Sequence, residues 1–120
     1  MRVTPPVFFC SLLVVASPAL ALKVDAKGLA RFDVNHAMCE ARVAEMRGRG
    51  DEIYLSLWNA KLDAAARAQL AQARKTGPYA AERRRLLPSP PKASEAAAFD
   101  QECRNLWTQA QRSMKDKAQP

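Results

Sequence analysis

Histidine and glycine are both scarce in this 120-residue chain, which contains one histidine, His36, and four glycines. Nucleophilic and acid–base catalysis usually need a base such as histidine beside a second functional group. No Gly-x-Ser-x-Gly motif, glycine-rich phosphate loop or Cys-x-x-Cys-His haem motif occurs. The close acidic pairs, Asp51 with Glu52 and Asp100 with Glu102, are one or two residues apart and would point in different directions on a helix. We therefore expect a protein that is not an enzyme and has no cofactor.

Strand signals are missing as well. The sequence contains no alternating apolar and polar run and no Asn-Gly or Asp-Gly turn, and β-branched residues are few after Val43. The chain is instead rich in Ala, Arg, Leu, Glu and Gln, which favour helices. These patterns predict an all-α fold, a small helical bundle of three long helices and one short helix.

The first 21 residues have the order of a secretory signal peptide. Arg2 is the only charged residue among them, an apolar run follows at 7–15, and Ala19 and Ala21 are the small residues that a signal peptidase accepts. The apolar run is shorter than the ~20 residues that a membrane-spanning helix needs. We expect cleavage after Ala21, which leaves residues 22–120 as a single periplasmic or secreted domain without a stable membrane span.

The cysteine count predicts one disulfide bond. Of the three cysteines, Cys10 lies within the expected signal peptide and would leave with it, whereas Cys39 and Cys103 remain. An even number of cysteines in an exported domain is typical of a disulfide. Both cysteines lie on apolar stripes of helical periodicity, so the bond would link the first and last helices.

Apolar periodicity places the helices and the Pro-rich connector between them. Asp33, Asp51 and Ser94 are the expected N-caps of the first, second and last helices. Trp58 would lie on the inner face of the long second helix, and Trp107 beside the apolar stripe of the last. The expected helices cover about 34–47, 52–75, 78–87 and 95–115, with the connector at 87–93.

A net charge of +7 favours an anionic partner. Arg83, Arg84 and Arg85 form the densest basic run, and Trp107, at the edge of the apolar stripe of the last helix, would be a typical binding anchor if it were exposed beside an arginine. These four residues are the candidate partner-binding residues. The run can also be read as a solvated turn that only keeps the protein soluble. Nucleic acid is not an expected partner, because export separates the protein from the genome.

A metal site is an alternative use of the same region as the disulfide. His36 is three residues from Cys39 and therefore on the same helix face, so His36, Cys39 and Cys103 could ligate zinc with help from Glu40. This site requires reduced thiols, whereas an exported protein favours the disulfide.

Part of the expected second helix, Tyr54 with 61–63 and 70–74, is similar to the helical, disulfide-bonded, secreted lysozyme inhibitors. The Trp-x-x-x-Arg-Asp-x-x-Cys ending of that family is missing, and basic lysozymes would repel a chain of this charge. We carry no residue over from the family.

The sequence therefore predicts a small non-enzymatic interaction protein, such as an inhibitor, an immunity-type protein or an envelope accessory protein, that binds an unknown acidic protein. A small-ligand or metal-binding bundle around His36 is the second hypothesis. A binder of an anionic envelope component, lipid or cell wall, is the third.

Overall fold

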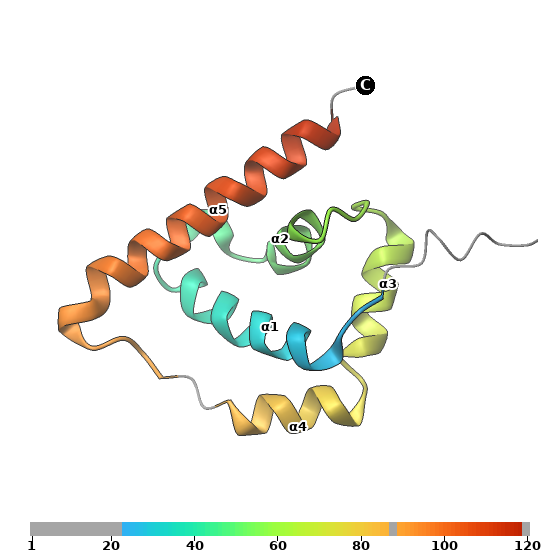
Figure 1. The fold of residues 1–120 in the computed structure, drawn as a ribbon, viewed down its shortest axis with the longest axis horizontal. Helices are drawn as coiled ribbons and strands as arrows, with labels where there is room; N and C mark the ends of the chain where they lie inside the picture. The colour runs from blue at the N-terminus through green and yellow to red at the C-terminus, as the bar shows by residue number, and fades with distance from the viewer. Residues whose placement is uncertain (1–22, 87–88, 119–120) are drawn as a thin grey trace, which may run out of the picture.

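The computed structural model describes residues 23–86 and 89–118; the expected signal peptide and its Cys10 lie outside this part of the chain. The described residues form helices and no strand, which confirms the all-α prediction (Figure 1). There are five α-helices and two short 3-10 helices: α1 (Ala26–Glu40), η2 (Ala44–Met46), α2 (Gly50–Leu57), α3 (Ala64–Ala73), α4 (Gly77–Arg85), η3 (Ala93–Glu95) and α5 (Ala96–Ala118).

The first helix begins earlier and ends earlier than predicted. Asp25 is its N-cap and accepts a hydrogen bond from the backbone N–H of Lys27. A single glycine costs a helix only about 1 kcal/mol, so Gly28 does not prevent the helix from starting here. The prediction that Asp33 is the N-cap is wrong, because Asp33 lies in the middle of α1.

The predicted long second helix is in fact two helices. α2 ends in a Schellman motif, in which the N–H of Ala60 bonds to the carbonyl of Leu55 and the N–H of Asn59 to that of Ser56. Asn59 has a φ of 56°, the left-handed conformation that the motif requires and that asparagine tolerates better than most residues. A new N-cap, Asp63, then starts α3 by accepting from the N–H of Ala66.

The starts of the other helices differ from the predictions in two places. α2 begins at Gly50 with Arg49 as N-cap, so Asp51 lies in its first turn and is not the cap. Ser94 lies within η3 and is not the cap of α5. Thr76 caps α4, and Pro78 occupies its first turn as expected.

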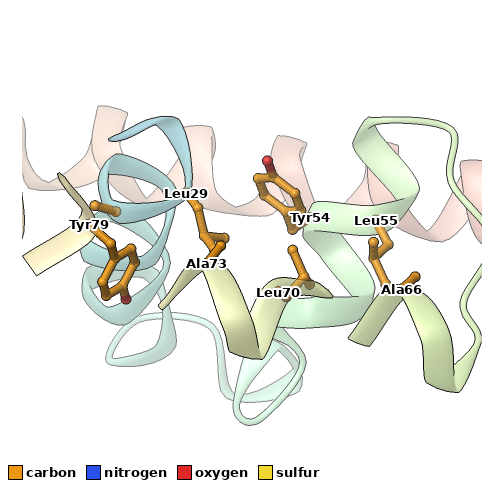
Figure 2. Packing of buried hydrophobic residues seen from close by; sticks show 8 residues of the cluster. Leu29, Tyr54, Leu55, Ala66, Leu70, Ala73 and Tyr79 are labelled. Atoms are coloured by element: carbon orange, nitrogen blue, oxygen red, sulfur yellow. The ribbon is translucent and has the colours of Figure 1, made fainter. Parts of the chain in front are cut away.

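The apolar side chains form two adjoining cores. The first lies between α1, α2, α3 and α4, and Figure 2 shows Leu29, Tyr54, Leu55, Leu70 and Tyr79 converging there. The second joins α5 to α2, to the end of α1 and to the segment after α1; its buried members are Cys39, Val43, Met46, Ile53, Cys103 and Ala110.

The elements pair as α1 with α4 and as α2 with α5. In Figure 1, α4 lies on the far side of α1 from α2 and from the C-terminal half of α5. No helix among the described residues is long and apolar enough to span a membrane.

Candidate functional site

The two predicted disulfide cysteines are joined. Cys39 and Cys103 form a disulfide with Cα atoms 5.4 Å apart, and each residue is only 1 % exposed. Arg42, three residues after Cys39, also contacts α5: its guanidinium pairs with Asp100 and lies 5.5 Å from the centroid of the Phe99 ring. The disulfide thus links α1 to α5, the first and last helices, as predicted.

With both sulfurs in the disulfide, Cys39 and Cys103 are not thiolate ligands in this structure. Within residues 23–86 and 89–118 no group of three or more His, Cys, Asp or Glu side chains is arranged to hold a metal ion. The zinc alternative at His36 therefore applies only to a reduced form of the protein.

His36 instead connects α1 to the segment that leads into α2. It is 5 % exposed, its Nε2 lies 3.0 Å from the carbonyl oxygen of Met46, and its Nδ1 lies 3.0 Å from a carboxylate oxygen of Glu40. The other carboxylate oxygen of Glu40 accepts the N–H of Gly48. A doubly protonated imidazole can donate to both partners, whereas a neutral ring can donate to only one. A Cβ at position 50 would lie 3.2 Å from Nδ1, so the close approach of α2 to the ring favours glycine there.

A polar cleft of about 440 Å³ opens beside His36, where α1, α2, α3 and α4 meet. Its main feature is Arg74, which makes two hydrogen bonds to Asp33 at 2.9 and 3.1 Å and one to Asp51 at 2.7 Å. Tyr79 also donates to Asp33. These hydrogen bonds to carboxylates raise the pKa of Arg74, and burial, followed by the bond to Asp33, raises the pKa of Tyr79.

The charged groups at the centre of this cleft are thus satisfied by one another. Sequence reasoning assigned Asp33 and Asp51 to helix caps and missed the network, because its members are 23 and 41 residues apart in the chain. The network joins four helices and gives the cleft a structural role.

The basic run Arg83–Arg85 is divided among three environments. Arg85 pairs with Glu82, which is 6 % exposed and also accepts from Arg31 at 3.0 Å. The hydrogen bond from Arg85, and then the one from Arg31, lower the pKa of Glu82 to about 2. Arg83 lies against Tyr79, with a 3.3 Å contact to its hydroxyl. The side chain of Arg84 is exposed and has no hydrogen bond or ion pair with any described residue.

Arg83 borders a second, more apolar hollow. This groove between α1 and α4 has a volume of about 260 Å³ and is lined by Val34, Ala37, Met38, Arg83 and Leu86. Arg83 and Ala37 also line the polar cleft, so the groove and the cleft adjoin at these residues. An apolar side chain could enter the groove while a carboxylate contacts Arg83 or its neighbour Arg84.

The two tryptophans have opposite environments. Trp107 is half-buried against the second core, with the guanidinium of Arg49 5.6 Å from its ring centroid. The prediction that Trp58 lies on an inner helix face is wrong: it is the C-cap of α2 and is 63 % exposed. The turn signal that could have shown this is Asn59 followed by Asp63, a left-handed C-terminal residue and a new N-cap.

The three comparisons with known proteins give no relative: no family model, no curated protein and no solved structure matches the chain.

Proposed function

We propose that this chain is an exported, non-enzymatic interaction protein of a bacterial envelope that binds an acidic protein partner. The signal-like N-terminus supports export, and the buried Cys39–Cys103 disulfide is consistent with an oxidising compartment. The size and basic charge suit an inhibitor, an immunity-type protein or an accessory subunit.

One observation carries the proposal: the chain has 19 basic and 12 acidic residues, and exposed basic side chains are left without an acidic partner. Arg84, Arg104, Arg112 and Lys115 are exposed and have no ion pair among the described residues. Positive charge presented in this way accelerates encounter with an acidic partner and selects against basic ones. The acids that contact a basic side chain are Asp33, Glu40, Asp51, Glu52, Glu82 and Asp100.

The α1–α4 groove is the first docking site to test. It combines apolar walls with Arg83, and arginine forms strong, directional contacts with carboxylates. The next residue on α4, Arg84, does not line the groove, but its exposed and unpaired side chain adds positive charge beside it. Arg85 is not part of this site, because its guanidinium is occupied by Glu82. Trp107 is not part of it either, since it packs on the second core.

The experiment is capture of envelope proteins on the immobilised, oxidised mature chain. An acidic protein should bind at low salt, and the double substitution Arg83→Gln with Arg84→Gln should weaken its binding about tenfold, which corresponds to about 1.4 kcal/mol. The matched control replaces Lys23 and Lys27 by Gln, which removes the same charge from exposed, unpaired positions at the start of α1. Equal losses of affinity in both variants would mean that binding depends only on net charge, which would argue against the groove as the docking site.

The two alternatives have their own supporting observations and tests. An anionic envelope surface would use the same outward cations and would bind anionic vesicles or cell-wall polymer without any protein. A small-ligand or metal binder would use the polar cleft beside His36. Metal retained through purification together with free thiols at Cys39 and Cys103 would favour that role.

A further inference from the structure

His36 is buried where α1 meets the segment 41–49 and the start of α2. Its ring stacks on Phe32, one helical turn earlier, with centroids 5.8 Å apart and an angle of 15° between the planes. Gly50 of α2 approaches the ring so closely that an added Cβ would lie 3.2 Å from Nδ1. The imidazole is therefore held in one place by packing, with both nitrogens fixed against their neighbours.

Both ring nitrogens of His36 face groups that can only accept a hydrogen bond. Nε2 lies 3.0 Å from the carbonyl oxygen of Met46, and Nδ1 lies 3.0 Å from a carboxylate oxygen of Glu40. A carbonyl and a carboxylate have no proton to give, so two hydrogen bonds require a proton on each nitrogen. A neutral ring that donates to Met46 would turn the lone pair of Nδ1 toward the carboxylate, which is repulsive. The geometry therefore fits the protonated, positively charged imidazole.

Charged groups from every neighbouring element surround this contact. They are Asp33 and Glu40 on α1, Arg47 and Arg49 in the segment 41–49, Asp51 and Glu52 on α2, Arg67 and Arg74 on or just after α3, and Tyr79 and Arg83 on α4. The two aspartates pair with Arg74, and Glu52 lies against two arginines. The carboxylate of Glu40, by contrast, has no salt bridge to any described residue other than His36. Its negative charge is therefore left to act on the imidazole.

We propose that His36 is a pH-sensitive latch between α1 and the segment that leads into α2. The protonated ring donates to Met46 and to Glu40, whose second carboxylate oxygen accepts the N–H of Gly48 at 3.1 Å. We define the His36 latch as His36, Glu40, Met46 and Gly48. Histidine changes charge between about pH 5 and 8, so the latch is complete at the acidic end of this range and is lost as the pH rises.

The latch controls how the segment 41–49 enters the second core. Val43 and Met46, both buried, carry this segment into the core. The carbonyl of Met46 also accepts the N–H of Arg49, whose guanidinium lies 5.6 Å from the centroid of the Trp107 ring on α5. Loss of the proton therefore loosens the contacts of α1 with α2 and α5 while the disulfide stays closed. The latch is independent of the proposed partner, because all of its members belong to one chain.

The first experiment is nuclear magnetic resonance of the oxidised, untagged protein labelled with nitrogen-15 in histidine. His36 is the only histidine, so each ring signal has one source. At pH 7, where an ordinary imidazole is mostly neutral, we expect both ring nitrogens of His36 to carry a proton. We expect the signals of a neutral ring to replace them as the pH is raised further. A ring that is neutral at pH 7 would overturn the latch.

The second experiment measures hydrogen exchange of single backbone amides at pH 6 and pH 9, corrected for base catalysis of exchange. The amides of Gly48 and Arg49 donate to Glu40 and Met46, so their protection should fall about tenfold between the two pH values. The amides of α3, which lies outside the latch, should keep their protection. Equal protection of Gly48 and Arg49 at both pH values would contradict the latch.

Two variants separate the latch from a merely structural contact. Glu40→Gln keeps an acceptor for Gly48 and nearly the same size but removes the charge, so it should abolish most of the pH dependence. Glu45→Gln is the matched control, because it removes the same charge from an exposed position in the same segment that has no ion pair among the described residues. It should retain the tenfold change. The same pH dependence in Glu40→Gln as in the wild type would assign the effect to another group and overturn the inference.

Discussion

Removal of the Cys39–Cys103 disulfide should destabilise the protein more than any other change considered below. α5 is 23 residues long and packs mainly against α2, which has eight. Several side chains along its apolar stripe, including Phe99, Leu106 and Met114, are only half-buried against the second core. The disulfide therefore holds α5 against a core that covers it on one side.

The expected magnitude follows from the length of the loop that the bond closes. The cysteines are 64 residues apart, and the loop-closure entropy for that length corresponds to roughly 4 kcal/mol. The free energy of unfolding of a small domain is about 5–15 kcal/mol, so the bond accounts for a large share of it. For a domain of about 100 residues, a loss of 4 kcal/mol lowers Tm by about 15–30 °C.

The assay is thermal unfolding followed by circular dichroism. The variant with both Cys39→Ala and Cys103→Ala should melt about 15–30 °C below the oxidised protein, and a reducing agent should lower the Tm of the wild type by a similar amount. The same agent should leave the double variant unchanged, which controls for other effects of reduction. A decrease of less than about 5 °C would refute the reasoning, because α5 would then be held by packing alone.

Three further substitutions test the structure elsewhere. Glu82→Gln should lower the free energy of unfolding at pH 7. The folded-state pKa of Glu82, about 2, lies below its ordinary value of 4.5, so the carboxylate stabilises the fold above pH 4.5 and loses this effect as the pH falls toward 2. The difference between wild type and variant in chemical denaturation should narrow over that range; a constant difference would mean that the ion pairs are not its cause. Asn59→Ala should cost about 1–2 kcal/mol in chemical denaturation because alanine is strained at positive φ, whereas Asn59→Gly should cost nothing; equal losses would contradict the Schellman turn. His36→Leu should cost about 1–3 kcal/mol, because the contacts of the imidazole with the Met46 carbonyl and the Glu40 carboxylate are lost; an unchanged denaturation midpoint would show that neither contact matters.

The features that could be predicted from the sequence are those that depend on local periodicity. Cys39 and Cys103 are the two cysteines that remain after the expected cleavage, so the cysteine count predicted their pairing. Their places on apolar helical stripes predicted that the first and last helices lie side by side. The stop and restart around Thr76 and Pro78 were also predicted, because capping and proline geometry act over a few residues.

What was missed depends on single turns and on contacts between distant residues. Good helix formers lie on both sides of Asn59, so the sequence predicted one long helix. The apolar periodicity of that predicted helix placed Trp58 on its inner face. In the structure the break at Asn59 leaves Trp58 outside the core. Asp33 looked like a cap because its partners, Arg74 and Tyr79, are 41 and 46 residues away.

The division of the basic run has a local and a distant part. Arg85 pairs with Glu82 and Arg83 contacts Tyr79 within α4 itself, at i,i+3 and i,i+4 spacing. The packing of α4 on α1 adds what the sequence does not show, because it buries Glu82 and brings Arg31 to it from 51 residues away. Pairing, rather than the density of the run, separates Arg84 from its two neighbours.

The most direct test of the central claim is native mass spectrometry of the protein recovered, without reducing agent, from the envelope of its own host. We expect a chain that begins at Leu22, lacks two hydrogens because of the disulfide, and is found in part in a complex with an acidic protein. A chain that retains Met1, or one that carries two free thiols and no bound protein, would contradict the account of an exported interaction protein.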